Sequence, residues 1–311
     1  MKRYKNRCIA MLMAVAFSIG VFGCANEPTG NPLDAVLSDV GKMLVTENTS
    51  PMPGSVGGEW SVLGLARWEK DVQEAWFQQY YEALEQILKE NDGVLDNRKY
   101  TEYSRAIIAV TAMDRDPKAV AGYDLLLPLA NYEQVCWQGN NGPIWALIAL
   151  DCGKWEIPED PTVAVQASRQ MYLEKILSAQ QESGGWGLAD KQPADVDITA
   201  MALQALAGYA DQQAVSAAIE RGLAWLAAQE RHTCESVAQV LVALGELGIA
   251  LEDERFAGLT DELLGFYREG QGFVHEQADS ESNYMSTEQA FYAMVSATRQ
   301  AEGKSSLYSM R

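Results

Sequence analysis

Short apolar helices, each preceded by a loop rich in glycine or polar residues, recur along this chain of 311 residues. Six such openings read EWSVLGLARW from Glu59, TEYSRAIIAVTAM from Thr101, NGPIWALIAL from Asn141, DVDITAMALQALAGY from Asp195, CESVAQVLVALGEL from Cys234 and STEQAFYAMVSA from Ser286. They recur at roughly 40 to 55 residues, a period that indicates a closed or stacked array of supersecondary units. The pattern therefore predicts a repeat fold built on six similar helices.

A second kind of helix, more amphipathic and more charged, is expected between these six. In EAWFQQYYEALEQILKE, which begins at Glu74, the apolar Trp76, Tyr80 and Leu84 recur at helical spacing and the opposite positions are Gln and Glu. The expected ranges are 33–45, 71–89, 117–129, 161–180, 211–229 and 254–268. Twelve alternating helices predict an all-α fold with essentially no strand. It is expected to form one domain over residues 33–311, a single (α/α)6 barrel whose six parallel inner helices are wrapped by six outer ones.

The N-terminal segment has the organisation of an export signal. It opens on the basic MKRYKNR, and Ile9 to Phe22 form an apolar stretch too short to span a bilayer. The stretch ends in VFGC, which resembles the lipobox of bacterial lipoproteins, although Phe22 departs from the small or branched residue usual there. The resemblance implies a signal peptide over 1–23, lipid attachment at Cys24, a tether over 24–32 and anchoring on the outer face of the bacterial cell membrane; simple secretion is the alternative.

The chain is strongly acidic, with 43 Asp and Glu against 24 Lys and Arg and a formal charge of −19. Removal of the leader takes away four of the basic residues and none of the acidic ones. Such a charge argues against nucleic acid or an anionic membrane surface as a partner, because both repel it.

Three cysteines lie beyond the leader and Cys24: Cys136, Cys152 and Cys234. Cys136 and Cys152 flank a helix of about 15 Å, well beyond disulfide reach. A pair between Cys136 and Cys234 is left open. The odd count and the absence of C-x-x-C spacing argue against a disulfide scaffold and a zinc cluster.

Four segments carry a resemblance to a known group: GGWG at Gly184, DVDITAMALQAL at Asp195, CESVAQVLVALGELGI at Cys234 and NYMSTEQAFYAM at Asn283. Over about residues 56–298 the chain resembles the superfamily of terpenoid cyclases and protein prenyltransferases. It is more similar to the bacterial extracellular branch, which is related to the cobalamin-binding transcobalamin and intrinsic-factor proteins. The resemblance implies an α/α toroid.

The chemistry of that superfamily requires residues that this chain has only in part. Class II cyclases protonate an alkene from a DxDD motif; Asp195 and Asp197 match it, but Ile198 replaces the third Asp. The prenyltransferases bind zinc with an Asp-x-Cys pair and a distant His, and Asp197 stands in the place of the Cys. A zinc or magnesium site from Asp195, Asp197 and His275 is one alternative, and an exposed loop imidazole at His275 is the other.

Acidic residues gather at the openings of the expected inner helices, where free N–H groups and the helix dipole favour a carboxylate. Capping explains each one singly. Parallel inner helices would in addition bring them to one rim, which favours an acidic ligand-binding mouth. The acids expected in first turns are Glu102, Asp195, Asp197, Glu235 and Glu288.

Aromatic residues lie at or just inside the same openings, either as core or as the lining of a ligand pocket. They are Trp60, Tyr103, Trp145, Trp186, Tyr284 and Phe291. Trp186, in a tetrapeptide that resembles the QW repeat, is interpreted as structural. The candidate ligand-binding set is Glu102, Tyr103, Trp145, Glu235, Tyr284 and Glu288, and the candidate catalytic pair is Asp195 and Asp197.

Two functional hypotheses follow. The first is a membrane-anchored extracellular module that binds a small molecule at the barrel mouth, with cobalamin or another corrinoid implied by the resemblance alone. Because nothing after Ser296 could build the C-terminal β-domain of the cobalamin carriers, a corrinoid would be held by half a site or with the help of a partner protein. The second is a terpene cyclase-like or prenyltransferase-like enzyme on an isoprenoid substrate, with Asp197 as the acid; the incomplete motifs favour the first.

Overall fold

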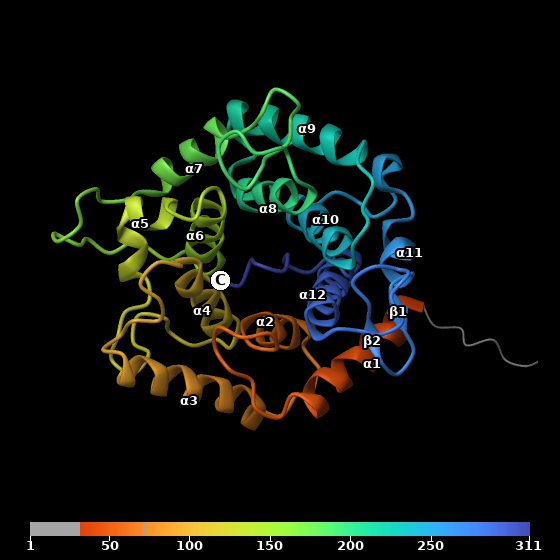
Figure 1. Cartoon of the computed structure of the whole chain (residues 1–311), viewed down its shortest axis with the longest axis horizontal. Coiled ribbons are helices and arrows are strands. Elements are labelled where there is room, and N and C mark those ends of the chain that lie inside the picture. The colour runs from red at the N-terminus through yellow and green to blue at the C-terminus, as the bar shows by residue number, and fades with distance from the viewer. Residues whose placement is uncertain (1–31, 71) are drawn as a thin grey trace, which may run out of the picture. The chain divides into compact units, whose positions relative to one another are not determined.

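Six inner helices form a closed ring in the computed structural model, which describes residues 32–70 and 72–311 (Figure 1). Each inner helix contacts the next, and the last contacts the first. The inner helices are α2 (Glu59–Trp68), α4 (Thr101–Ala112), α6 (Asn141–Cys152), α8 (Val196–Leu206), α10 (Cys234–Leu247) and α12 (Tyr284–Ala301). The expected (α/α)6 barrel is therefore confirmed for this part of the chain.

A second set of helices surrounds the ring (Figure 1). Its members are α1 (Pro32–Glu47), α3 (Glu74–Glu90), α5 (Tyr132–Cys136), α7 (Arg169–Ser178), α9 (Gln213–Ala227) and α11 (Leu259–Leu264). Short 3-10 turns, η1 (Leu127–Ala130), η2 (Ala207–Tyr209) and η3 (Glu254–Phe256), adjoin three of the helices.

Burial explains which helices lie inside. In α6 every residue from Gly142 to Leu150 is buried, so this helix is stable only with neighbours on all sides. In α3 the buried residues recur every four positions, which gives the helix one buried stripe. The ring closes tightly where α2 meets α12, since a Cβ on Gly64 would lie 2.8 Å from the Phe291 ring.

Three outer helices are much shorter than the sequence pattern predicts. Within 117–129 the chain reverses in a turn at Ala121 and Gly122, both with positive φ, closed by the bridge between Val120 and Tyr123. Within 161–180 the chain forms turns and bends over 161–165 and pairs Gln166 with Asn131 in an isolated bridge. The helix α7 begins only after its N-cap, Ser168. Within 254–268, where one long helix was expected, only η3 and α11 are helical.

One short hairpin accompanies the helices, in keeping with an all-α fold that has essentially no strand. A two-stranded antiparallel hairpin, β1 (Tyr267–Arg268) and β2 (Gly272–Phe273), lies between α11 and α12. Gly270 and Gly272 have φ values of +68° and +98°, which residues with a Cβ rarely adopt. The pattern of apolar residues carries no signal for so short a hairpin.

The C-terminal tail, residues 302–311, crosses the far end of the ring, and the chain ends beside α4 and α6 in projection (Figure 1). Leu307 is fully buried and Tyr308 is 5% exposed. Arg67 holds the tail by donating from Nε to the Leu307 carbonyl at 2.9 Å and from Nη2 to the Ser306 carbonyl at 2.8 Å. The tail therefore closes the barrel at the end opposite to the helix N-termini.

Cys136, Cys152 and Cys234 are all free thiols, so the alternative of a Cys136–Cys234 disulfide is not realised. No helix within 32–70 and 72–311 has the length and apolar character needed to cross a bilayer. The signal peptide, Cys24 and most of the expected tether lie outside the described residues.

Candidate functional site

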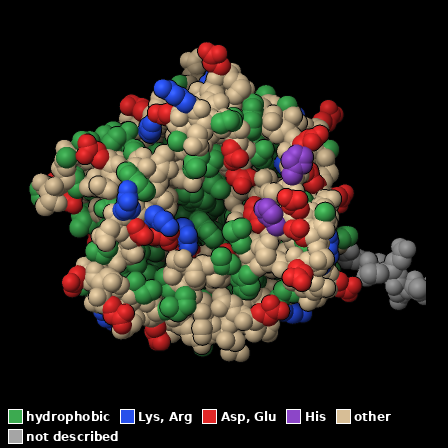
Figure 2. Space-filling model, viewed as in Figure 1, with side chains coloured by type: hydrophobic (Ala, Val, Ile, Leu, Met, Phe, Trp, Pro, Cys, Tyr) green, Lys and Arg blue, Asp and Glu red, His purple; other side chains and the backbone are tan. Residues whose placement is uncertain are grey.

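Residues near the N-terminal ends of the inner helices build one mouth at that end of the barrel. Five helices contribute residues in pairs four positions apart, which share one helix face. The pairs are Thr101 and Arg105, Asn141 and Trp145, Asp197 and Met201, Glu235 and Gln239, and Glu288 and Tyr292. The second member of every pair lines a central cavity of about 210 Å³. Figure 2 shows this face, with a hydrophobic hollow bordered by acidic side chains, by basic side chains on the left and by the two histidines on the right.

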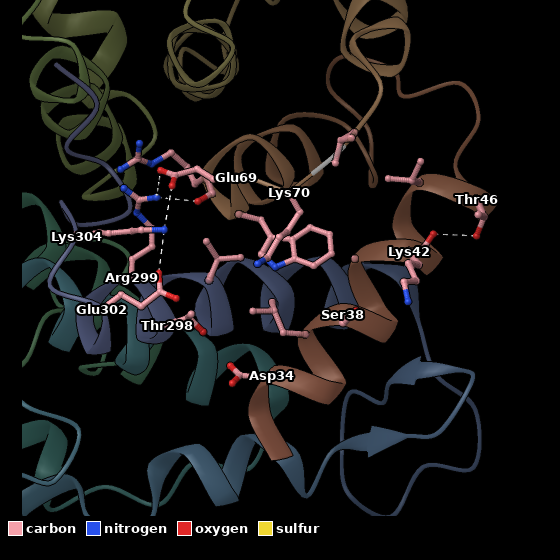
Figure 3. A pocket seen from close by; sticks show the side chains of 17 residues that line it. Asp34, Ser38, Lys42, Thr46, Glu69, Lys70, Thr298, Arg299, Glu302 and Lys304 are labelled. Atoms are coloured by element: carbon pink, nitrogen blue, oxygen red, sulfur yellow. Dashed lines mark hydrogen bonds and ion pairs between the residues drawn. The ribbon is translucent and has the colours of Figure 1, made fainter. Parts of the chain in front are cut away.

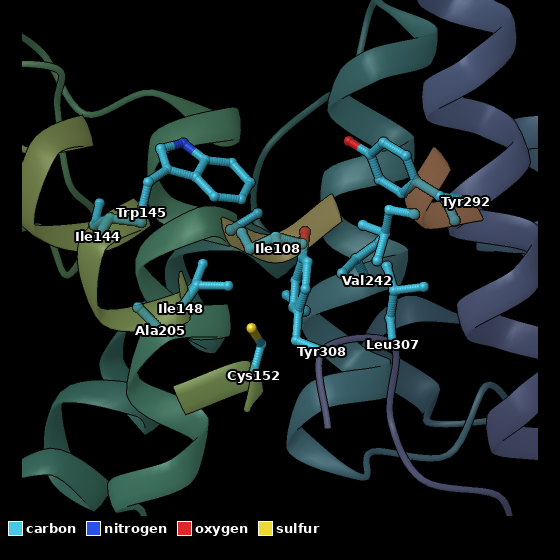
Figure 4. Close-up of a cluster of buried hydrophobic side chains, with 14 of the residues drawn as sticks. Ile108, Ile144, Trp145, Ile148, Cys152, Ala205, Val242, Tyr292, Leu307 and Tyr308 are labelled. Atoms are coloured by element: carbon cyan, nitrogen blue, oxygen red, sulfur yellow. The ribbon is translucent and has the colours of Figure 1, made fainter. Parts of the chain in front are cut away.

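Aromatic rings form the floor of this mouth cavity. Trp60 and Trp145 lie with their ring centroids 4.9 Å apart, and the Tyr292 ring lies 6.0 Å from that of Trp60. All three side chains line the cavity. Figure 4 shows Trp145 and Tyr292 facing the lumen from opposite walls. A flat apolar ligand surface could stack on such a floor.

Two residues of the cavity wall each have a polar atom that is buried without a hydrogen-bond partner among the described residues: Arg105 Nε and Asn141 Oδ1. Arg105 is fixed by Glu59, whose carboxylate accepts from Nη2 at 2.7 Å, and lies 3.5 Å from Glu102. Buried polar groups are usually paired, so one unpaired donor and one unpaired acceptor beside a single cavity point to a ligand. Elsewhere on the cavity wall, polar side chains pair with each other: the Gln239 side-chain N–H donates to the Tyr292 hydroxyl at 2.6 Å.

The Asp197 carboxylate lies in the first turn of α8. Its Oδ1 accepts a hydrogen bond from the Ser236 hydroxyl at 2.6 Å, and no other hydrogen bond to its side chain is seen among the described residues. Burial raises the pKa of Asp197, against the opposing effect of that hydrogen bond. Met201, one turn further along α8, lines the cavity. Asp197 therefore lies on the mouth side of its helix.

Glu235 and His275 form a second titratable pair on the next helix. Glu235 Oε2 lies 2.8 Å from His275 Nδ1, and its Oε1 accepts from the Ser286 hydroxyl at 2.5 Å. The chain before α12 runs beside the start of α10, where the Cys234 N–H donates to the His275 carbonyl, and this places the imidazole over Glu235. The hydrogen bond to Glu235 raises the pKa of His275.

Several residues expected at the site have other roles. Asp195 is the N-cap of α8, accepting from the Ile198 N–H at 3.0 Å, and lies before the first turn. The Tyr103 hydroxyl accepts from the Leu95 N–H in the loop after α3, and the Tyr284 hydroxyl donates to the Leu44 carbonyl of α1, so both hydroxyls are bound to the outer layer. Trp186 is fully buried, in keeping with its structural interpretation.

Glu288 was expected in the first turn of its helix, but α12 begins at Tyr284 and has no acidic residue in its first turn. The Glu288 carboxylate accepts from the Gly57 N–H and the Ser61 hydroxyl, both at 2.9 Å. Burial raises its pKa to about 7. Glu288 therefore fastens the α1–α2 loop and α2 to α12. Glu102 lies at the rim beside Arg105, and burial raises its pKa as well.

The sequence interpretation missed most of the cavity lining. Arg105, Asn141, Met201, Gln239, Gln289 and Tyr292 contact the cavity, and only Trp145 of the expected ligand-binding set does so. A signal was present, because four of these residues lie one helical turn after a polar residue at a helix opening. No group of three or more His, Cys, Asp or Glu side chains within the described residues could hold a metal ion.

The barrel lumen below the floor is filled from the other end. Tyr308 of the tail packs edge-on against Trp145 with ring centroids 6.3 Å apart. Figure 4 shows Tyr308 standing between the walls of the lumen, below Trp145 and Tyr292. The mouth cavity is therefore shallow.

Comparison with solved structures finds similar folds among glycan-degrading enzymes. The GH76A alpha-1,6-mannanase from Salegentibacter sp. HEL1_6 matches with a TM-score of 0.59 and 10% identity, over 86% of this chain and 99% of that chain. An inactive variant of it, with two consecutive aspartates replaced by alanine and alpha-1,6-mannotetrose bound, matches with a TM-score of 0.59 and 11% identity, over 86% and 98%. At this identity the likeness shows the toroid fold. No protein-family model and no curated protein matches the chain.

These findings correct the expected function. Both of these structural neighbours are mannanases, so the terpenoid-cyclase resemblance holds only at the level of the α/α toroid. The cavity gives a physical reason as well, because about 210 Å³ accommodates neither a corrinoid macrocycle nor a long isoprenoid chain. The hypotheses of a corrinoid-binding module and of a terpene cyclase or prenyltransferase are therefore wrong.

Proposed function

We propose that this chain is a carbohydrate-active enzyme that receives the end of a glycan at the barrel mouth and hydrolyses a glycosidic bond there. The observation that carries the proposal is one cavity that combines an aromatic floor, Trp60 and Trp145, with the unpartnered Arg105 Nε and Asn141 Oδ1. The fold it shares with alpha-1,6-mannanases, one with a mannotetrose bound, supports the same class of ligand.

A sugar ring suits both features of the cavity. Its C–H faces are apolar and stack on aromatic rings, and its hydroxyls donate to and accept from buried polar groups. The volume of about 210 Å³ lies below the roughly 300 Å³ at which pockets for drug-sized ligands begin, so the cavity fits a single ring. The rest of an oligosaccharide would lie across the acidic rim.

The wall formed by α8 and α10 offers the two carboxylates that glycoside hydrolysis requires. Asp197 is the proposed general acid, since burial moves its pKa in the direction that a proton donor needs. Glu235 is the proposed second carboxylate, and it orients the His275 imidazole beside the same wall. The two acids lie in the same layer of the mouth, one turn before Met201 and Gln239.

The carboxylates would be arranged differently from those of the mannanase neighbour. The inactive mannanase variant lacks two consecutive aspartates. No two consecutive aspartates occur in this chain. The two proposed carboxylates come instead from two helices, Asp197 from α8 and Glu235 from α10. The sugar and the linkage are therefore to be found by screening, with alpha-1,6-mannotetrose as one member of the panel.

The test is the release of reducing ends from a panel of oligosaccharides by the wild type, Asp197→Asn and Glu235→Gln. We expect each substitution to lower kcat by about 10² or more while glycan binding persists, because proton transfer is lost and the floor is unchanged. Asp195→Asn is the matched control, since asparagine also caps a helix and activity should remain. Hydrolysis by Asp197→Asn at the wild-type rate would contradict the assignment.

We also propose that Cys24 carries a lipid, which would hold the enzyme on the outer face of the membrane, where glycans are accessible. The support is the VFGC segment that follows the apolar stretch. The variant Cys24→Ala should leave the detergent phase or keep its leader. A variant that is cleaved elsewhere yet remains in the membrane fraction would contradict lipidation.

A further inference from the structure

A second, larger cavity lies at the opposite end of the barrel from the mouth. It measures about 740 Å³ and lies between α1, the end of α2 and the end of α12 (Figure 3). Its volume falls in the range of about 300 to 1,000 Å³ that is typical of small-molecule sites. None of its lining residues belongs to the mouth.

The middle of this side cavity is apolar. Trp68, Leu37 and Val295 are among its lining residues. The half-buried Trp68 ring lies against the backbone of α1, because a Cβ on Gly41 would come within 2.5 Å of it. The ring is thus held in place, and a ligand needs no rearrangement to reach its open side.

The polar groups of the side cavity carry an excess of positive charge in an acidic protein. Five Lys and Arg side chains line it: Lys42, Arg67, Lys70, Arg299 and Lys304. Three acids line it: Asp34, Glu69 and Glu302. Glu69 and Glu302 are already paired, Glu69 with Arg299 at 2.6 Å and Glu302 with Lys304 at 2.9 Å.

The two lysines that remain are available to a ligand. Lys42 and Lys70 are exposed and form no ion pair or side-chain hydrogen bond with the described residues. Asp34 is the one acidic residue of the lining that belongs to neither of these ion pairs among the described residues. It carries a single charge and lies at the start of the α1 segment that lines the cavity. The available charge therefore favours an anion.

A buried hydroxyl adds a directional contact. Thr298 lines the cavity, and its Oγ1 is buried without a hydrogen-bond partner among the described residues. Unpaired buried polar atoms are uncommon, and a ligand oxygen at this wall would satisfy it. Thr298 comes from α12, whereas Lys42 and Lys70 come from α1 and from the segment after α2.

We propose that the side cavity binds an amphipathic organic anion whose apolar part lies along Trp68, Leu37 and Val295 and whose anionic head is attracted by Lys42 and Lys70. Thr298 supplies the hydroxyl donor. A free fatty carboxylate and the acyl chain and headgroup of an anionic lipid share this chemistry. The site is independent of the proposed glycan site.

The experiment is calorimetric titration of the purified full-length protein with decanoate below its micelle concentration, with decyltrimethylammonium as the cationic match. We expect decanoate to bind at one site per chain and the cation not to bind. The double variant Lys42→Glu with Lys70→Glu should weaken decanoate binding by about tenfold or more. The matched control, Lys118→Glu with Lys191→Glu, reverses two other exposed lysines and should bind as the wild type does.

Two further variants test the cavity itself. Gly41→Val should displace the Trp68 ring into the cavity and abolish binding, and Thr298→Val should weaken binding by several-fold while the fold, followed by circular dichroism, is kept. Vesicles of phosphatidylglycerol and of phosphatidylcholine distinguish the two sources of ligand. Equal binding of decanoate and its cationic match, or unchanged affinity in the Lys42→Glu, Lys70→Glu variant, would overturn the proposal. So would binding to anionic vesicles without any binding of decanoate.

Discussion

The two ends of the barrel differ in charge, and the direction of the inner helices explains the difference. At the mouth, acids occupy the first turns of α2, α4, α8 and α10. At the far end, Arg67 and Arg299 occupy the last turns of α2 and α12. A helix dipole favours negative charge at its N-terminus and positive charge at its C-terminus. Parallel inner helices add these preferences, which explains the acidic mouth. The far end is mixed, because Asp151 and Glu246 lie in the last turns of α6 and α10.

At each end of the barrel, one buried carboxyl has a role other than helix capping. Glu288 fastens the α1–α2 loop at the mouth, and Glu246, near the end of α10, accepts from the Tyr308 N–H at 3.0 Å and the Ser306 hydroxyl at 2.7 Å. Burial raises the pKa of each to about 7. Both carboxyls hold non-helical segments against the ring, a role that the helix dipole does not predict.

The largest expected effect tests whether the far end is a closed plug. Tyr308→Ala removes a buried ring from the lumen and should lower the free energy of unfolding by about 3 to 5 kcal/mol. Tyr308→Phe is the matched control and should change it by less than about 1 kcal/mol, because the hydroxyl is buried without a partner among the described residues. Urea melts measure both. A loss below about 1 kcal/mol in Tyr308→Ala would mean that the tail does not occupy the lumen in solution.

The second prediction concerns the carboxyl that fastens the mouth. The folded-state pKa of Glu288, about 7, lies above the usual 4.5, so its contribution to stability is present below pH 4.5 and is lost as pH rises through 7. Glu288→Gln should match the wild type near pH 4.5 and exceed its free energy of unfolding by about 1 to 3 kcal/mol above pH 8. Exposed Glu133→Gln serves as the reference. A Glu288→Gln effect of equal size at both pH values would refute the buried-carboxyl account.

The smallest expected effect distinguishes Asp195, which caps α8, from Asp197, the proposed catalytic acid two residues later. Asp195→Ala should cost about 1 kcal/mol, because the Ile198 N–H loses its acceptor. Asp197→Asn should change the free energy of unfolding by less than about 0.5 kcal/mol, since asparagine can still accept from Ser236. Thermal melts compare the two. The reverse order would assign the structural role to Asp197.

The sequence predicted the architecture because the alternation of fully apolar and one-sided helices is a local property. Stretches such as AQVLVAL in α10 and EAWFQQYYEAL in α3 carry it in their own residues. The helix openings likewise located the mouth. The shortened outer helices were not predictable, because the bridge from Asn131 to Gln166 depends on a segment 35 residues away. The position of Tyr308 in the lumen and the partners of Glu288 follow from contacts across the ring.

The most direct test of the central claim, that the aromatic mouth receives a glycan, is calorimetric titration of Trp145→Ala and Trp137→Ala with the oligosaccharide that the panel identifies. Trp145 forms the cavity floor, whereas Trp137 is 54% exposed and lies outside the cavity lining. We expect Trp145→Ala to lower affinity by about tenfold or more through lost stacking, and Trp137→Ala to bind as the wild type does. Wild-type affinity in Trp145→Ala, or equal losses in both variants, would contradict the account.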